Sequence, residues 1–488
     1  MAAGIRLEER CTLERLFSSK QAEFLAIYGR RRVGKTYLIR SFFSQKKATF
    51  FMVTGAKDAP MQEQIEHVTE QIASVFLSGL MPGLAKDWNG VFKVLTEAMR
   101  LLPKGRKIIL FFDELPWMAT KNARLLQTLE YYWNQHWSAD PRIKLIVCGS
   151  SASWIVDKII NSRGGLHNRV TETIQLETLN LYETNCYLKS RGITLRQDQV
   201  LKIYMAMGGI PYYLNKVEKG LTAIQLIEKL AFRKRSFFLD EFDNLFAALF
   251  DGHESYIEII TKIAERPYGI NQEDLFAQLS TVQKGQGPLN KLNVLERSGF
   301  IMSFIPYGRK VKGKYYRVID EYVLFYLRWI APVKESLRKN GLKRGYWEKM
   351  QTTGAWYAWS GYVFENICHK HVMQISEALA LNPAAIPHTW RYVPTKTQAE
   401  KGAQVDLLFD RDDNAITLCE IKYTAQPFKL DKAYAAILQQ RSKIFAKQTR
   451  TKKQIFLALI SVSGIKPSMY SEELLDQVVT LSDLFEKH

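Results

Sequence analysis

The sequence predicts a multidomain α/β protein whose first domain is a mostly parallel sheet covered by helices. Its 488 residues are enough for roughly two to four domains of ordinary size. Residues 1–180 alternate short apolar, β-rich runs with longer helical patterns, and a second alternation follows residue 356. With 47% hydrophobic and 24% charged residues, the composition excludes disordered, collagen-like and disulfide-scaffold proteins.

The order of these patterns predicts five segments. The strands expected in the first segment are near-continuous apolar runs, typical of strands buried on both faces: 24–29, 48–53, 107–113 and 144–150. Helices punctuated by Gly208-Gly209-Ile210-Pro211 follow, then three short helices and a basic hairpin, the pattern of a winged helix. A Lys-, Arg- and Gly-rich connector leads to a second α/β unit. The expected bounds are 1–180, 181–245, 246–330, 331–355 and 356–488.

The charge balance favours a polyanionic partner. Lys and Arg number 68 against 49 Asp and Glu, a formal net charge of +19, and nucleic acid is the first candidate; a generally basic surface is the alternative. The five cysteines form no C-x-x-C motif and are expected to be reduced thiols. No run of 18 apolar residues and no signal-peptide core occurs, so we expect no membrane span and a cytoplasmic protein.

A phosphate-binding motif lies between a predicted strand and a predicted helix. The motif G-x-x-x-x-G-K-[ST] needs glycines so that backbone N–H groups can surround phosphate oxygens, with the helix N-terminus adding partial positive charge. Its lysine reaches the β- and γ-phosphates, and its hydroxyl is a Mg²⁺ ligand. The sequence therefore predicts ATP binding by Gly29, Arg30, Arg31, Arg32, Val33, Gly34, Lys35 and Thr36.

Further polar residues follow the neighbouring strands. Asp113 and Glu114 end an apolar strand, where Asp113 is suited to hold Mg²⁺ and Glu114 to act as general base on the attacking water. Ser150 ends the next strand and is expected near the γ-phosphate or the water, although a helix cap is the simpler interpretation. Arg169 is a candidate arginine finger, from this or a neighbouring subunit, or an ordinary surface arginine.

Residues 1–235 combine several motifs: G-R-R-R-V-G-K-T, F-F-D-E, C-G-S-S, an arginine after a Gly-rich turn, and G-G-I-P-Y-Y-L. In these motifs they resemble the archaeal-type P-loop ATPases of the AAA+/STAND group. The resemblance implies a helical lid over the nucleotide, a following winged helix and Arg169 near the phosphates. It leaves open whether copies of the chain assemble through the ATPase domain.

A second constellation lies near the C-terminus. Asp406 and the pair Glu420 and Lys422 interrupt two apolar strands in the pattern D-x13-E-x-K, and Glu420 and Lys422, two apart, share one strand face. Two carboxylates make an oxygen site of the kind Mg²⁺ takes, Lys422 can orient a water, and Glu365 on the preceding helix can supply a further acid. A solvated strand face is the alternative.

The residues G-Y-V-F-E, V-D-L-L-F and C-E-I-K-Y, in the order helix, strand, strand, helix, strand, resemble the PD-(D/E)xK superfamily with its restriction-endonuclease-like fold. The resemblance implies a Mg²⁺-dependent nuclease site, or a nuclease-like domain that binds DNA without cutting. The basic hairpin is a candidate DNA contact or a packing element; its charged residues are Arg309, Lys310, Lys312, Lys314 and Arg317.

Together these patterns predict an ATP-binding and ATP-hydrolysing DNA-processing protein with a metal-dependent endonuclease domain. The alternative is a STAND-type switch, in which nucleotide state controls assembly or partner binding and the last domain only holds DNA or a partner.

Overall fold

The computed structural model describes residues 4–161, 166, 168–280, 286–309, 313–394 and 402–487. The chain folds into two compact units. Unit 1 comprises Met1–Thr178 with Arg297–Gly299, and unit 2 comprises Leu179–Glu296 with Phe300–His488. Lys310 and Lys312 of the expected basic hairpin lie outside the described residues.

Unit 1 contains a five-stranded sheet in the order β2-β3-β4-β1-β5, with every pair of neighbours parallel. The strands are β1 (Glu23–Tyr28), β2 (Ala48–Thr54), β3 (Lys107–Asp113), β4 (Ile143–Gly149) and β5 (Glu172–Gln175). β3 and β4 are buried along nearly their whole length, as their apolar sequences predict. The predicted parallel sheet of the first domain is thus confirmed.

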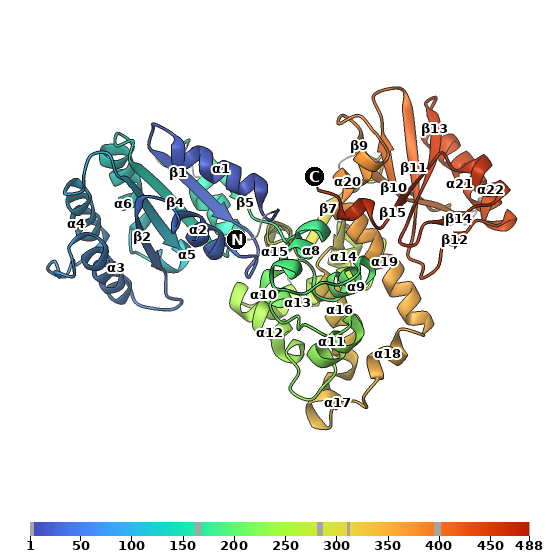
Figure 1. Ribbon diagram of the computed structural model, residues 1–488, viewed down its shortest axis with the longest axis horizontal. Coiled ribbons are helices and arrows are strands. Elements are labelled where there is room, and N and C mark those ends of the chain that lie inside the picture. The colour runs from blue at the N-terminus through green and yellow to red at the C-terminus, as the bar shows by residue number, and fades with distance from the viewer. Residues whose placement is uncertain are drawn as a thin grey trace. The chain divides into compact units, whose positions relative to one another are not determined.

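Helices cover both faces of this sheet (Figure 1). On one face, Leu16 of α1 (Leu7–Ser18) and Ile39 of α2 (Lys35–Phe43) share a core with Ile146 of β4. The other face carries a larger aromatic-rich core. Its helices are α3 (Met61–Phe76), α4 (Trp88–Arg100), α6 (Leu125–Tyr132), η1 (Trp133–Trp137), α7 (Ala152–Ile155) and η2 (Val156–Ile160). Because all the strands are parallel, their carboxyl ends meet at one edge, where polar residues gather.

Unit 2 begins with short helices. These are α8 (Leu181–Ser190), α9 (Gln197–Met207), α10 (Pro211–Leu214), α11 (Ala223–Ala231) and α12 (Phe238–Leu249). The turn between α9 and α10 needs its glycines. Gly208 has a φ of 64°, and a Cβ on Gly209 would lie 1.7 Å from the Leu179 carbonyl oxygen. Pro211 then starts α10, where its missing N–H costs nothing.

A small three-stranded sheet follows, in the order β6-β8-β7 with antiparallel neighbours. Its elements are α13 (His253–Ala264), β6 (Ile270–Asn271), α14 (Gln272–Ala277), α15 (Gln286–Arg297), β7 (Ile301–Phe304) and β8 (Tyr315–Val318). The Asn271 side chain accepts from the Asp274 N–H and caps α14.

The expected connector 331–355 is folded into the body of unit 2. After α16 (Glu321–Phe325), η4 (Tyr326–Ile330) and η5 (Ala331–Val333), it contains α17 (Lys334–Lys339) and α18 (Tyr346–Met350). Trp347 of α18 is 1% exposed and stacks on Phe232, with ring centroids 5.2 Å apart. The basic composition of this stretch hid Trp347, which anchors it to an aromatic cluster of unit 2 that includes Phe232, Phe325 and Trp329.

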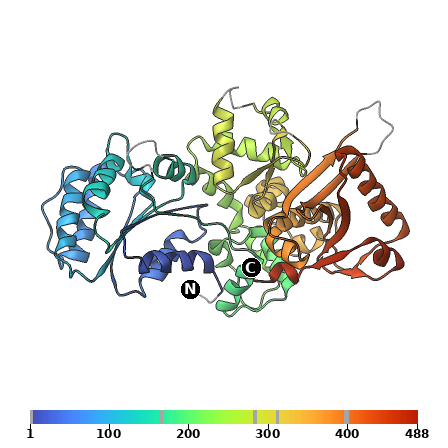
Figure 2. The same cartoon turned by 90° about the horizontal axis from the view of Figure 1, so that it is seen from above.

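The second large sheet has the order β15-β13-β11-β10-β9. β9 (Ile386–Tyr392), β10 (Ala403–Asp410) and β11 (Ala415–Lys422) are antiparallel, whereas β13 (Gln454–Ser461) and β15 (Gln477–Thr480) add in parallel. α21 (Lys432–Thr449) packs on β10, and α19 (Gly354–Lys370), continued by α20 (Val372–Ala378), packs on β11. The strands are orange to red in Figure 2. β12 (Phe428–Lys429), β14 (Ile465–Lys466) and α22 (Met469–Leu474) complete this part.

None of the helices within the described residues is both long and apolar enough to cross a membrane.

Candidate functional site

The phosphate-binding loop joins β1 to α2 and depends on unusual backbone angles. Gly29, Arg32 and Gly34 have φ values of 142°, 73° and 98°. A Cβ on Gly29 would lie 2.2 Å from the Leu176 carbonyl oxygen, so only glycine fits there. The Lys35 side chain is buried, and its Nζ donates to the carbonyls of Gly29 at 2.9 Å and Arg30 at 3.0 Å. The loop therefore closes around the lysine that the motif assigns to the phosphates.

The structure brings the two predicted Mg²⁺ ligands into direct contact. Thr36 is at the start of α2 and Asp113 at the end of β3, 77 residues apart in sequence. The Thr36 hydroxyl donates to Asp113 Oδ2 at 2.8 Å. A hydroxyl and a carboxylate held side by side at the start of a helix suit a cation that bridges phosphates, so this donor set fits Mg²⁺ bound with a nucleotide.

Glu114 is held by the residue that follows β4. Its backbone lies in the left-handed region, with φ 48° and ψ 45°, which turns the chain sharply after β3. The backbone N–H and the hydroxyl of Ser150 both donate to Glu114 Oε2 at 2.9 Å. The strand order explains the contact, because β4 lies between β1 and β3. Ser150 was expected near the γ-phosphate or the water; here it orients the predicted base.

Arg169 is exposed, and its backbone N–H donates to the Leu166 carbonyl at 3.1 Å. No contact between its side chain and the phosphate-binding loop is found in the described part of unit 1. Its role as an arginine finger therefore stays a prediction.

In unit 2, the hairpin of β10 and β11 brings the predicted acids together. Leu407 pairs with Cys419, and continuing this antiparallel register by one residue places Asp406 opposite Glu420. Asp406 also lies where the pairing of β10 with β9 is interrupted by a bulge. Its Oδ2 accepts from the Ile421 N–H at 3.3 Å, and its Oδ1 accepts from Gln404 at 3.3 Å.

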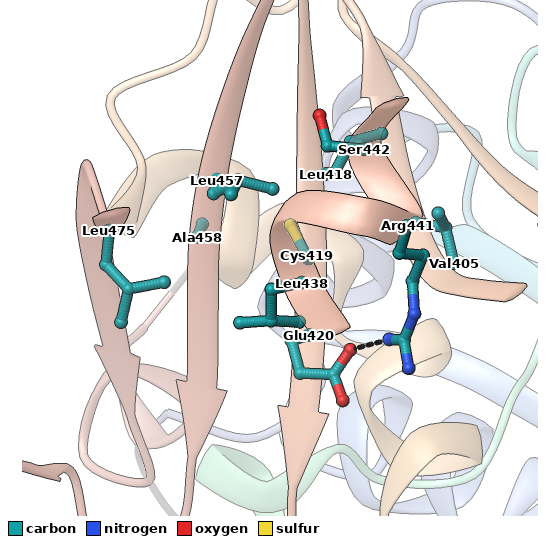
Figure 3. A pocket seen from close by; sticks show the side chains of 10 residues that line it. All are labelled: Val405, Leu418, Cys419, Glu420, Leu438, Arg441, Ser442, Leu457, Ala458 and Leu475. Carbon is teal, nitrogen blue, oxygen red and sulfur yellow. Dashed lines mark hydrogen bonds and ion pairs between the residues drawn. The ribbon is translucent and has the colours of Figure 1, made fainter. Parts of the chain in front are cut away.

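Glu420 is the most heavily paired of these acids. Its side chain is 7% exposed, and its Oε1 lies 2.6 Å from Lys422 Nζ. α21 supplies two further donors. The Tyr434 hydroxyl donates to Oε1, and the Arg441 guanidinium donates to Oε2, as Figure 3 shows. Burial acts to raise the pKa of Glu420, but Lys422 and Arg441 outweigh it and hold that pKa below its usual range.

Asp406 and Glu365 are shifted the other way. Burial and the charge of Glu420 raise the pKa of Asp406 to about 6. Burial, then Asp406 and Glu420, raise the pKa of Glu365 on α19 well above its usual range. Carboxyl groups whose pKa values are pushed apart are typical of functional sites. The structure thus places Asp406, Glu365, Glu420 and Lys422 within one electrostatic cluster.

This cluster is not arranged as a metal site as its side chains stand. No group of three His, Cys, Asp or Glu side chains placed to hold a metal ion is found in the described part of the chain. Both Glu420 oxygens accept from cationic or hydroxyl donors, so binding a cation at Glu420 requires Arg441 or Lys422 to move.

Sequence reasoning missed Tyr434 and Arg441, which lie on one face of α21. Their spacing of seven residues is two helical turns, and this was the available signal. Nothing in a helix rich in Lys and Gln distinguished Arg441, its single arginine, as a residue that turns inward. His369 and His371 are structural: His369 Nε2 lies 3.1 Å from the Asp406 carbonyl oxygen, and His371 is fully buried.

Comparison with known proteins bears on the first of these two sites. Residues 6–217 match the family model described as an ATPase domain predominantly from Archaea. The chain carries an archaeal-type ATPase domain. That domain contains the phosphate-binding loop, Asp113, Glu114 and Ser150, and the match supports ATP binding and hydrolysis there.

Similarity extends over most of the chain in one relative. The uncharacterized protein MJECL04 of Methanocaldococcus jannaschii is 24% identical over 430 residues, which cover 86% of this chain and 87% of the relative. Among solved structures, the Walker-type ATPase PABY2304 of Pyrococcus abyssi is 16% identical, with a TM-score of 0.47, and covers 67% of this chain and 96% of its own. The ORC2 protein of Aeropyrum pernix is 14% identical, with a TM-score of 0.42, and covers 69% of this chain and 96% of its own. With TM-scores below 0.5, neither likeness indicates a function.

Proposed function

We propose that this chain is an ATP-hydrolysing DNA-processing protein whose C-terminal domain is a metal-dependent nuclease. In this proposal residues 181–245 are a helical lid, 246–330 a winged helix and 356–488 a restriction-endonuclease-like domain. The order of α13, β6, α14, α15, β7 and β8 supports the second assignment. The helix with Glu365, the strand with Asp406 and the strand with Glu420 and Lys422 support the third.

The hydrogen bond between Thr36 and Asp113 carries the ATPase part of the proposal. Gly29 to Gly34 bind phosphate oxygens, Lys35 neutralises them, and Thr36 and Asp113 hold Mg²⁺. Glu114, oriented by Ser150, takes the proton of the attacking water. Arg169 is proposed to stabilise the charge that develops on the phosphates, from its own or a neighbouring copy of the chain.

The nuclease part rests on the convergence of Asp406, Glu420 and Lys422. When bound, Mg²⁺ would activate water and stabilise charge on a phosphodiester. Asp406 and Glu420 would hold it, with Glu365 beside them as a further acid. Lys422 would then orient a water, because a bound cation would replace Lys422 as the partner of Glu420. The net charge of +19 supports DNA as the partner.

One observation favours a second candidate, a nucleotide-controlled switch that holds DNA without cutting it. Arg441 and Lys422 together neutralise Glu420, and both contacts exist in the protein alone. An acid that already has two cationic partners has less need of a metal ion.

The two candidates are separated by incubating the full chain with plasmid, linear and single-stranded DNA, with Mg²⁺ or Mn²⁺, with and without ATP. The proposal expects cleavage that requires a divalent cation and is lost in Asp406→Asn and Glu420→Gln, while ATP hydrolysis continues. Asp412→Asn, an exposed acid in the turn between β10 and β11, is the matched control and should cut normally. If the native chain cuts none of these DNAs in any condition, the switch takes the place of the nuclease.

A further inference from the structure

The small sheet of unit 2 forms one wall of a pocket that Glu365 and Asp406 also line. This pocket is partly open to solvent. Glu365 and Asp406 line it from α19 and β10, while Arg309 and Arg317 line it from the hairpin of β7 and β8. Two contacts fix this wall: the Tyr307 N–H donates to the Thr389 carbonyl at 2.8 Å, and Asn366 donates to the Val318 carbonyl at 3.1 Å.

Arg317 is a buried cation in the wall of this pocket, which Glu365 also lines. It is 6% exposed, and its buried Nε finds no hydrogen-bond partner within the described part of the chain. Its guanidinium lies 4.7 Å from the centre of the Phe304 ring, which fixes its position on β8. Burial lowers the pKa of Arg317 to about 10, so it stays cationic at neutral pH. A buried cation with an unsatisfied donor is costly unless an anion binds it.

An exposed aromatic residue lies at the same pocket. Tyr268, in the turn before β6, is 51% exposed, and the Arg391 guanidinium lies 5.5 Å from its ring centre. Tyr268 lines the same pocket as Glu365 and Asp406. Burial, then the charges of these two acids, raise the pKa of its hydroxyl. An exposed tyrosine paired with an arginine is a surface on which an unstacked base can lie.

We propose that this pocket binds one unpaired nucleotide of the DNA substrate, with its phosphate at Arg317 and its base against Tyr268 and Arg391. The inference deepens the proposed nuclease function and rests on it for the role of the nearby acids. A guanidinium and an aromatic ring in one pocket match the phosphate and the base of a single nucleotide. A base inside a duplex is stacked and paired and cannot reach such a ring, so the substrate is single-stranded or has an unpaired end.

Binding is measured with the full chain in EDTA, so that cleavage is not required. The probes are a fluorescein-labelled oligo(dT) of about 20 nucleotides, long enough to span one single-strand binding site, and a blunt hairpin duplex, compared by fluorescence anisotropy. We expect Arg317→Met and Tyr268→Leu each to weaken oligo(dT) binding by about tenfold, in line with one lost phosphate or stacking contact. Duplex binding should change by less than about twofold, because other Lys and Arg residues carry it.

The controls are Tyr357→Leu, a 63% exposed tyrosine on α19, and Arg344→Met, an exposed arginine before α18; both should bind oligo(dT) like the native chain. Since Arg317 is buried, Tyr268→Leu tests the pocket even if Arg317→Met unfolds. Suppose that the native chain cuts no DNA and that Tyr268→Leu loses oligo(dT) binding. That result would support the pocket and refute the nuclease function. Normal binding by Tyr268→Leu in a chain that does cut, or no binding of oligo(dT) by the native chain, would overturn the pocket.

Discussion

The two acidic sites of the molecule are built differently, although each places carboxylates and a lysine near the ends or edges of buried strands. In unit 1, Asp113 and Glu114 accept from the neutral hydroxyls of Thr36 and Ser150, and Lys35 donates to backbone carbonyls. In the second sheet of unit 2, Glu420 pairs directly with the cations of Lys422 and Arg441. The first site is arranged for a polyanion and a cation to enter together, whereas the second is already charge-balanced and must rearrange to bind a metal ion.

The largest effect expected from this comparison concerns Glu114. Glu114→Gln should lower the rate of ATP hydrolysis by about a thousandfold, because a positioned general base contributes about 10² to 10⁴. The hydrogen bonds from Ser150 can persist on the amide oxygen, so ATP should still bind. Phosphate release and titration with a fluorescent ATP analogue measure the two properties. Lys35→Ala is the contrasting variant and should lose binding itself; hydrolysis by Glu114→Gln at the native rate would show that another group is the base.

His371 makes the stability of unit 2 depend on pH. Its Nε2 accepts from the Leu181 N–H at 3.0 Å, and its Nδ1 lies 2.7 Å from the Ile367 carbonyl oxygen. Burial lowers the pKa of His371 to about 4, so the native ring stays neutral while the unfolded ring takes up a proton near its ordinary pKa of about 6.5. The stability that the neutral ring contributes is therefore present above about pH 6.5 and is lost as the pH falls to about 4, by about 3 kcal/mol.

This prediction is tested by urea unfolding at several pH values in the native chain and in His371→Gln, which does not titrate. Asp406 and Glu365, whose pKa values are raised, act in the opposite direction in both proteins, so they cancel in the difference. The difference in the free energy of unfolding between the native chain and His371→Gln should shrink as the pH falls from neutral toward the pKa of His371. A difference that stays constant over that range would mean that the ring is not held neutral.

Arg441 tests the charge balance of the second site. Arg441→Met should destabilise unit 2 by about 2 kcal/mol, because it leaves Glu420 buried with one fewer partner; this is below the full cost of breaking a buried pair since Arg441 is 23% exposed. Thermal unfolding measures this loss of stability. Adding Glu420→Gln should restore part of it. A double variant whose loss of stability exceeds the sum of the losses in the two single variants would argue against the pairing. Arg411, which pairs with the exposed Asp413, offers a control: Arg411→Met should cost less than about 1 kcal/mol.

The smallest effect concerns Ser150. Ser150→Ala removes the hydroxyl that donates to Glu114 but keeps the backbone N–H on the same oxygen. The rate of ATP hydrolysis should fall by about tenfold, the worth of one hydrogen bond to a charged group. Binding should not change. A loss of ATP binding with an unchanged rate would place Ser150 at the phosphates, as the sequence first suggested.

The sequence predicted the parts of the molecule that depend on local patterns. Four apolar runs became β1, β2, β3 and β4 within about one residue, because a strand buried on both faces leaves an unbroken apolar signature. The spacing of the phosphate-binding motif fixed Lys35 and Thr36, since backbone geometry allows few residue types there. These features need no knowledge of distant partners.

Features that depend on long-range contacts were not predictable. The contact of Ser150 with Glu114 follows from β4 lying between β1 and β3, which a pattern along one chain does not reveal. Arg441 and Tyr434 reach Glu420 from α21, whose buried residues are the apolar Ala435, Leu438, Ile444 and Phe445. The segment 331–355 looked like a linker because of its many charges, yet its buried Trp347 stacks on Phe232 in unit 2.

The most direct test of two separate sites measures phosphate release and DNA cleavage together in the native chain, Glu114→Gln and Asp406→Asn. We expect Glu114→Gln to lose phosphate release, and Asp406→Asn to release phosphate at the native rate while cutting no DNA. The proposed division of labour is contradicted if Asp406→Asn cuts DNA as the native chain does, or if it loses phosphate release together with cleavage, since the two sites would then not be separate.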